Sequence, residues 1–323
     1  MQTVDTAEDK LKGQRNPFAR AGSQLAALLG LVLVCIVLSI LSPHFPTLSN
    51  FFNISRQAAV ITIIAIGETF VILTGGIDLS VGSLVTLTSC TMAIVMITTG
   101  SIPLGVLAAI AVGLLTGGIN GALVTRAKLP PFIVTLGMMG IAQGVALVIT
   151  TGRSMYGLPE AFKFVGQGYV GPIPTPLAII AILFAIFHVI LNYNRLGRYI
   201  LSVGGNEEAT RLSGVNVDRV KMAAYMISGL TAAIGGIVLS SRINSAHPAA
   251  GQGYELDAIA AAVIGGTSLM GGEGTIIGTV IGAFMMAVIR NGLNLLNVNV
   301  YWQQIIIGMV IIGAVWVDRA RKR

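Results

Sequence analysis

Four acidic side chains, Glu68, Asp78, Glu255 and Asp257, lie within or beside long apolar runs of the sequence. If these runs cross a membrane, each charge costs about 3 kcal/mol on insertion scales. Such groups face protein or water, and they often line pathways for ions or polar solutes. We therefore treat Asp78, Glu255 and Asp257, together with Ser80, as candidates for a translocation path or gate. Glu68 is kept apart as an acid inside the membrane region whose role the sequence leaves open.

Each acid also has a simpler structural explanation. Asp78 or Ser80 is suited to cap the N-terminus of the helix that follows. Glu255 and Asp257 precede an apolar run and are suited to its outer end. Glu68 differs because apolar residues flank it on both sides. We favour a paired structural role for Glu68 over proton transfer.

Two amides near the end of another apolar run, Asn291 and Asn294, join the candidates for a polar path or gate. They shortly precede Tyr301 and Trp302, an aromatic pair typical of a membrane interface. The amides are equally suited to capping a helix end and to contacting a polar solute. The sequence leaves both roles open.

No catalytic motif accompanies these groups. None of the lysines is followed by Ser or Thr, so the usual phosphate-binding P-loop is absent. His44, His188 and His247 are far apart and have no neighbouring cysteine, which argues against a metal site. The sequence therefore predicts a protein without its own ATPase site, and without a metal or cofactor.

The elements that position these groups are predicted to be membrane-spanning helices. Hydrophobic residues make up 54% of the chain, charged residues 10%, and the mean hydropathy is +0.84. These values predict an all-α polytopic membrane protein with about ten transmembrane helices. The spans are expected near 24–42, 57–74, 79–99, 103–124, 131–150, 175–192, 222–241, 255–270, 275–296 and 301–317.

Charge predicts the orientation of these spans. Of the 20 Lys and Arg residues, 15 fall in segments that lie on one side if the N-terminus is cytoplasmic. The positive-inside rule therefore places residues 1–23, the loop 193–221 and the basic C-terminus 318–323 in the cytoplasm, around a transmembrane region 24–317. Topology thus accounts for the net charge of +7 without a nucleic-acid partner.

Two glycine-rich breaks interrupt the apolar pattern. The first break covers residues 74–83 and the second covers residues 264–275. Paired breaks of this kind can line a central path, but ordinary turns have the same composition. Pairs of glycines four residues apart are instead expected to pack helices against each other, at Gly113 with Gly117 and Gly278 with Gly282.

The polar loop 193–221 is longer than a simple turn requires. Residues 207–212 can form one or two helical turns of mixed charge, which suits a docking surface, although a solvated loop is the alternative. The residues expected to contact a cytoplasmic motor subunit there are Gly204, Gly205, Asn206, Glu207, Glu208, Ala209, Arg211 and Gly214.

Three stretches together resemble the permease subunit of ribose-type ABC importers. They are Gly-Gly-Ile-Asp-Leu-Ser-Val-Gly-Ser at 75–83, the polar strings at 195–200 and 204–214, and Gly-Tyr-Glu-Leu-Asp-Ala-Ile-Ala-Ala at 253–261. The resemblance runs along nearly the whole chain beyond its variable N-terminal residues. It looks closest to ribose permeases within a group that also includes permeases for galactose, xylose, inositol and autoinducer-2.

The resemblance implies a homodimer in the bacterial inner membrane, with a path for a monosaccharide, most closely D-ribose, at the two-fold axis. Cytoplasmic ATP-binding subunits would hydrolyse ATP, and a periplasmic binding protein would deliver the sugar. The loop 193–221 would place its short helix in a groove of the ATPase. Glu68 is a departure that the resemblance does not explain.

Other classes of protein remain open at this point. An ion-coupled secondary transporter of a small polar solute would use Glu68 or Asp78 as its coupling site and would need no ATPase. A channel or a membrane receptor is a third possibility.

Overall fold

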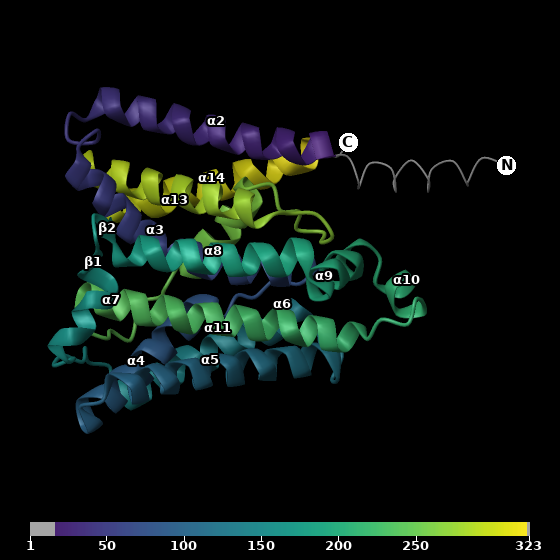
Figure 1. The fold of residues 1–323 in the computed structure, drawn as a ribbon, viewed down its shortest axis with the longest axis horizontal. Coiled ribbons are helices and arrows are strands. Elements are labelled where there is room, and N and C mark those ends of the chain that lie inside the picture. Colours follow the sequence, from purple (N-terminus) through teal and green to yellow (C-terminus); the bar gives the residue numbers. More distant parts are fainter. Residues whose placement is uncertain (1–16, 322–323) are drawn as a thin grey trace.

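The computed structural model describes residues 17–321, which form a bundle of helices lying roughly along one direction (Figure 1). Residues 1–16 and 322–323, parts of the predicted cytoplasmic termini, lie outside the described residues. The helices are α2 (Pro17–Leu41), α3 (Leu48–Leu73), α4 (Val81–Thr99), α5 (Ile102–Thr125), α6 (Pro131–Thr150), α7 (Lys163–Gln167), α8 (Thr175–Tyr193), α9 (Arg195–Gly205), α10 (Glu207–Leu212), α11 (Val217–Ile243), α12 (Tyr254–Ile264), α13 (Ile276–Leu295) and α14 (Val300–Arg321), with a short 3-10 helix η1 (Glu160–Phe162) and two strands, β1 (Tyr169–Val170) and β2 (Ile173–Pro174).

The all-α polytopic prediction is confirmed. Among the described residues, eight helices are long and apolar enough to cross a membrane: α2, α3, α4, α5, α6, α8, α11 and α13. Helix α14 adds a shorter apolar stretch, Val300–Trp316. The protein is therefore a multi-pass membrane protein.

The eighth predicted span, residues 255–270, differs from its prediction. Helix α12 has only 11 residues, about 16 Å of helix, which is short of the roughly 30 Å apolar core of a bilayer. It ends at Ile264 with Gly265 as its C-cap, and Gly266 follows with φ of +89°. Because this left-handed backbone suits glycine, the helix stops while the composition stays apolar.

Helix α3 is the centre of the bundle. It packs against α8, α11, α12 and α13, and nearly all of its residues from Ile54 onward are buried. Helix α2 lies at the outside of the bundle and exposes a row of leucine and isoleucine side chains, as a lipid-facing helix does. Polar groups on α3 are thus enclosed by protein.

Glycines set the closest helix contacts, as the sequence predicts. A methyl group on Gly113 or Gly117 of α5 would collide with the backbone of α11, at Gly229 and Tyr225 respectively. Gly278 and Gly282 of α13 likewise lie against the backbone of α12 and its C-cap. These are the packing contacts expected of small residues in membranes.

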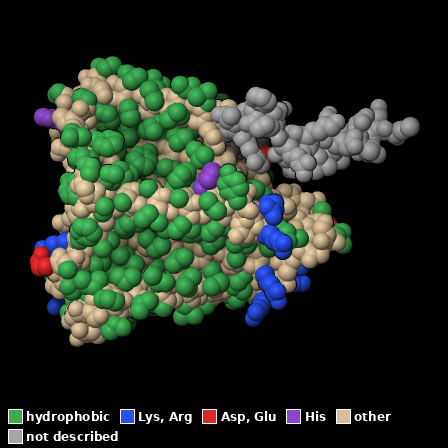
Figure 2. Space-filling model, viewed as in Figure 1, with side chains coloured by type: hydrophobic (Ala, Val, Ile, Leu, Met, Phe, Trp, Pro, Cys, Tyr) green, Lys and Arg blue, Asp and Glu red, His purple; other side chains and the backbone are tan. Residues whose placement is uncertain are grey.

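The two ends of the bundle differ in charge. Helices α9 and α10 project from one end, and Lys and Arg side chains gather there beside a broad hydrophobic surface (Figure 2). Helix α2 begins and α14 ends toward the same end, whereas η1, α7 and the β1–β2 hairpin cover the other. This arrangement agrees with termini on one side of the membrane; which side faces the cytoplasm stays a prediction.

Candidate functional site

The first break folds back into the bundle. After α3 ends at Leu73, the chain returns alongside the helix, so that the backbone N–H of Asp78 donates to Glu68 Oε1 at 3.0 Å. Both residues are fully buried. The Glu68 carboxylate thereby satisfies a backbone donor that has no other acceptor at this depth. Glu68 Oε2 has no hydrogen-bond partner within residues 17–321.

Asp78 is the hub of the polar groups at the first break. Its Oδ1 accepts bonds from the N–H and the hydroxyl of Ser80 at 3.0 and 2.5 Å, and its Oδ2 accepts from Ser228 Oγ of α11 at 2.9 Å. Asn120 of α5 donates to Ser80 Oγ at 3.0 Å. Thr135 of α6 donates to the carbonyl of Ile77 at 3.0 Å. Four helices therefore hold this segment in place.

The predicted capping role is only partly realised. Ser80 occupies the N-cap position of α4, but its side chain makes no capping bond there. Instead, its hydroxyl and N–H both turn toward Asp78. The acid therefore orders the break and does not cap the helix.

Glu255 lies close to the start of α4. Its Oε1 accepts from Gly253 N–H at 3.2 Å, and a methyl group at Gly82 would collide with its Oε2. Gly251 N–H donates to Thr86 Oγ1 at 2.9 Å in the same region. The N-terminal ends of α4 and α12 thus meet inside the protein, next to the segment that holds Asp78 and Ser80.

Asp257 and Arg290 form an ion pair between α12 and α13. Arg290 Nη2 lies 2.8 Å from Asp257 Oδ1 and 2.7 Å from Oδ2. The Asp257 side chain is fully buried, and that of Arg290 is 30% exposed. A buried carboxylate needs such a partner, because an uncompensated charge is costly away from water.

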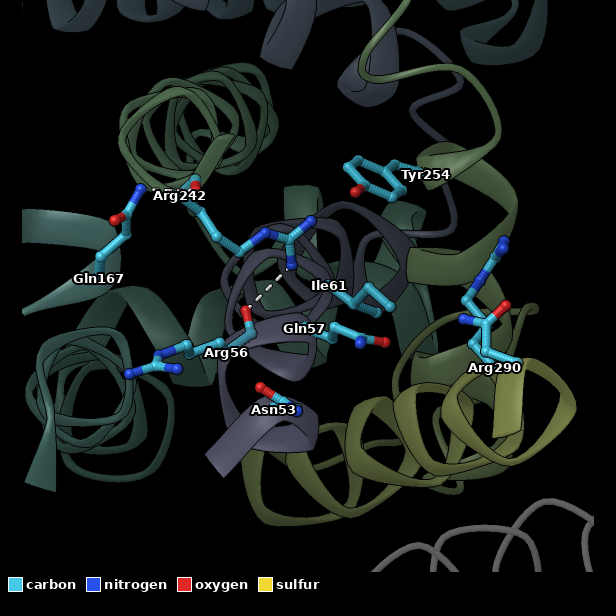
Figure 3. A pocket seen from close by; sticks show the side chains of 9 residues that line it. Asn53, Arg56, Gln57, Ile61, Gln167, Arg242, Tyr254 and Arg290 are labelled. Carbon is cyan, nitrogen blue, oxygen red and sulfur yellow. Dashed lines mark hydrogen bonds between the residues drawn. The ribbon is translucent and has the colours of Figure 1, made fainter. Parts of the chain in front are cut away.

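Arg290 also lines a cavity of about 620 Å³ at the end of the bundle that α7 covers. Three arginines line it: Arg290 is paired with Asp257, and the Arg56 side chain turns away from Arg242 toward Tyr169, to whose hydroxyl its guanidinium donates at 2.7 Å. Arg242 donates to the carbonyl of Arg56 at 3.2 Å, as Figure 3 shows. The lining residues of this outer pocket are Asn53, Arg56, Gln57, Ile61, Gln167, Arg242, Tyr254, Arg290 and Asn294.

Sequence reasoning found only Asn294 in this pocket. Arg56 and Arg242 lie near the ends of α3 and α11, more than 180 residues apart in sequence, and only the packing of α11 against α3 brings them together. Their position near the outer ends of predicted spans was the available signal. That signal did not indicate that Arg56 and Arg242 lie beside the same pocket.

The two amides have different surroundings. Asn291 Nδ2 donates to Asn50 Oδ1 at 2.9 Å in a buried contact that joins α13 to α3. Asn294 Oδ1 accepts from Gln303 Nε2 of α14 at 2.8 Å, and Asn294 also lines the outer pocket. The predicted path residues therefore fall into two groups, one at the first break and one beside the outer pocket, with Asn291 in neither.

The eight residues expected to contact a motor subunit lie in one corner at the end opposite the outer pocket. Helix α10 forms as predicted, and the Asn206 side chain caps it through a 2.9 Å bond from Ala209 N–H. Gly204 and Gly205 belong to the last turn of α9. Glu208, Ala209 and Leu212 are exposed, Leu212 at 83%.

Ion pairs hold α10 against the start of α11. Glu207 lies 3.0 Å from Arg211 and 2.6 Å from Lys221, and Arg211 lies 3.5 Å from Asp218. The pKa of the Glu207 carboxyl lies below its ordinary value. Partial burial acts to raise this pKa, but the hydrogen bonds and charges of Lys221 and Arg211 lower it by more. The corner is therefore fixed and ionised at neutral pH.

Comparison with known proteins identifies the family. Residues 50–315 match the family model described as the permease component of branched-chain amino acid transport systems. The chain belongs to this permease family. It is 45% identical over 300 residues to the ribose import permease protein of Escherichia coli strain K12, covering 92% of this chain and 94% of the relative.

Two further relatives span most of the permease. The ribose import permease protein of Bacillus subtilis strain 168 is 42% identical over 321 residues, covering 98% of this chain and 99% of the relative. The xylose transport system permease protein of E. coli strain K12 is 35% identical over 336 residues, covering 85% and 86%. No solved structure matches the chain.

Proposed function

We propose that this permease is the membrane-spanning subunit of an ATP-driven importer that carries a monosaccharide, D-ribose, across the bacterial inner membrane. The similarity to ribose import permeases along more than nine-tenths of the chain carries the proposal. The geometry agrees with it, because a polar interior, an outer pocket and a projecting docking corner occur in one helical bundle.

The energy for transport comes from a partner. The sequence has no Lys followed by Ser or Thr, so ATP hydrolysis is assigned to a separate cytoplasmic subunit. Helix α10 is suited to dock on that subunit, because it projects from the bundle, is braced by Glu207 and Lys221, and exposes Leu212. In this arrangement the start of α2 and the end of α14, which lie toward the α9–α10 end, face the cytoplasm.

The outer pocket is suited to receive the periplasmic binding protein and its sugar. Three arginines line it, and two of them, Arg56 and Arg242, have no acidic partner within residues 17–321. The pocket therefore carries a net positive charge that attracts acidic side chains of a partner. Its amides and Tyr254 offer hydrogen bonds to sugar hydroxyls. A second copy of the chain completes the path at the dimer axis.

Reconstitution tests the proposal. The permease is placed in proteoliposomes with its ATPase and sugar-binding protein, and labelled ribose, xylose and galactose are compared. We expect ATP-dependent uptake that is largest for ribose. Uptake that proceeds without ATP and follows an ion gradient would contradict the proposal.

Docking through α10 has its own test. Glu207→Lys puts a third positive charge beside Arg211 and Lys221, and Gly205→Pro breaks the last turn of α9. Both variants should insert normally but bind the ATPase less and lose solute-stimulated hydrolysis. Glu160→Lys, at the opposite end, is the control and should leave both unchanged. Normal stimulation in both corner variants would exclude α10 as the docking element.

One observation keeps the ion-coupled transporter as a second candidate. Glu68 is fully buried in the centre of the bundle, and its Oε2 is without a hydrogen-bond partner in the described part of the chain. A proton carrier needs such a carboxylate.

A further inference from the structure

Three segments that are distant in sequence meet at Gly204. A methyl group there would collide with the carbonyl oxygen of Leu73, at the end of α3, and with the backbone of Gly271 and Gly272 in the second break. Gly204 belongs to α9, which leads into α10. The docking corner therefore meets the central helix and the second break in direct backbone contact, beside the buried side chains of Ile200 and Val203, which share a hydrophobic cluster with Leu73.

The contact is mutual and hydrogen-bonded. A methyl group on Gly271 would lie 2.9 Å from Gly75 N and 3.0 Å from Gly204 Cα. Gly272 N–H donates to the Leu73 carbonyl at 3.0 Å. We call Leu73, Gly75, Gly204, Gly271 and Gly272 the glycine junction.

Only glycine fits at most of these positions. Gly75, Gly271 and Gly272 have φ of +80°, +85° and +75°, a left-handed backbone that other residues adopt with strain. Gly204 has an ordinary helical backbone, so its requirement is space alone. A contact between backbones cannot yield by rotating a side chain, and packed interiors transmit small displacements.

Both breaks lead from the junction toward the predicted path. The first break runs from Gly75 to Asp78, which is held by Glu68 and Ser228. The second break begins at the end of α12, where Gly265 lies against Gly278 of α13. A shift of α9 by a fraction of an ångström therefore has to move both breaks, or separate them from α9.

We propose that the glycine junction transmits movement of the docking corner to both breaks together, with Gly204 as the positioning residue that keeps the backbones in contact. This inference rests on the proposed function, because it needs a motor subunit that acts on α9 and α10. It adds the route by which a movement of the docking corner reaches both breaks of the same protomer.

Gly204→Ala tests the junction because it adds one methyl group without backbone strain. The matched control is Gly118→Ala in α5, where no heavy atom lies within 4 Å of the added methyl. Each variant is reconstituted with the ATPase and the binding protein, and the amount of assembled complex, ATP hydrolysis and sugar uptake are measured. We expect Gly204→Ala to keep ATPase binding but to lose most uptake per ATP hydrolysed.

The ratio of uptake to hydrolysis separates transmission from folding. A residue needed only for folding lowers the amount of complex and leaves sugar taken up per ATP unchanged, as it is in Gly118→Ala. An unchanged ratio in Gly204→Ala would therefore overturn the inference. The wild-type complex is measured in parallel; if it fails to import sugar with ATP, the proposed function fails and the junction is not at issue.

A second measurement uses the wild-type complex and does not depend on how any variant folds. Hydrogen exchange of peptides covering residues 74–83 and 264–275 is compared between the nucleotide-free and ATP-bound complexes. Exchange should change in both peptides on ATP binding. A change in one peptide alone, or in neither, would show that the junction does not link the two breaks.

Discussion

The backbone N–H of Asp78 donates a hydrogen bond to the side chain of Glu68, ten residues earlier. The nitrogen and Oε1 are 3.0 Å apart, and both residues are fully buried. The bond explains why an acid occupies the middle of an apolar helix. A buried N–H without an acceptor costs about 1–3 kcal/mol, and at this position no helix or strand ladder supplies one. Glu68 is thus the acceptor for a segment that folds back into the membrane region.

Glu68→Gln should therefore retain most ATP-dependent sugar uptake. The amide oxygen of Gln can accept from Asp78 N–H as the carboxylate does, but it cannot carry a proton through a cycle. Uptake by proteoliposomes is measured with ATP, and then with a proton gradient alone. If uptake needed the gradient, ran without ATP and vanished in Glu68→Gln, the second candidate function would replace the first.

Glu68→Leu is the companion variant. It removes the acceptor and leaves Asp78 N–H buried without a partner, so the permease should unfold at a lower temperature in detergent, by an amount corresponding to about 1–3 kcal/mol. Gln should be close to wild type in the same assay. Equal stability of the Leu variant would mean that the bond does not hold the first break.

The sequence predicted the parts of this site but not their contact. Glu68 was correctly placed inside a span and Asp78 in a glycine-rich break, because composition and hydropathy report local surroundings. That the break returns beside α3 depends on hydrogen-bond donors from other helices, Ser228 and Thr135 among them. These are tertiary contacts, and no local pattern records them.

The eighth span shows a different limit. Residues 255–270 have the apolar composition of a span, but α12 ends at Ile264 because Gly265 and Gly266 start a turn. Hydropathy averages over such a turn. Backbone conformation at a single glycine decides where the helix ends.

The Asp257–Arg290 pair should behave as a coupled unit. Arg290→Ala leaves a fully buried carboxylate without its partner and should destabilise the permease by about 3 kcal/mol, near the lower end for buried pairs because Arg290 is partly exposed. Replacing both residues by Ala should cost less than the sum of the single changes. Thermal unfolding in detergent is compared for the wild type, the two single variants and the double variant. If the two single losses of stability add up to the loss in the double variant, the pair contributes no coupling energy.

The docking corner, where the ion pairs of Glu207 hold α10 against α11, should become mobile only at acidic pH. Because the pKa of Glu207 in the folded protein lies below its ordinary value, its ion pairs contribute stability that is fully present above the ordinary Glu pKa of about 4.3. That contribution is lost as the pH falls through the lowered value. A spin label at Ser213→Cys, read by electron paramagnetic resonance, should stay equally mobile from neutral pH down to the ordinary Glu pKa and become more mobile below it.

Two variants check that Glu207 causes this effect. Glu207→Gln should make the label mobile already at neutral pH, because the amide cannot pair with Lys221 and Arg211 as a charge. Glu208→Gln, which removes an exposed neighbouring acid, should follow the wild-type curve. Identical curves for the two variants would assign the transition to another group.

The outer pocket makes a prediction about salt. Arg242→Gln removes one guanidinium group that has no acidic partner within the described residues, and should weaken stimulation by the binding protein. It should also make the remaining stimulation less sensitive to ionic strength, since screened charge pairs are fewer. Arg153→Gln, an exposed residue outside the pocket, is the control. The same salt dependence in wild type and Arg242→Gln would remove the pocket from the docking surface.

Topology is decided by side-specific labelling at Ser213 and Arg153, which are both exposed and lie in the loops after α10 and α6. In a background with Cys35→Ala and Cys90→Ala, a cysteine at Ser213 should react with an impermeant maleimide only from the cytoplasm, and one at Arg153 only from the periplasm. The reason is the excess of Lys and Arg at the α9–α10 end, which resists transfer across the membrane. Labelling of Ser213→Cys in intact cells would reverse the orientation, and with it the assignment of α10 to the ATPase and of the arginine pocket to the binding protein.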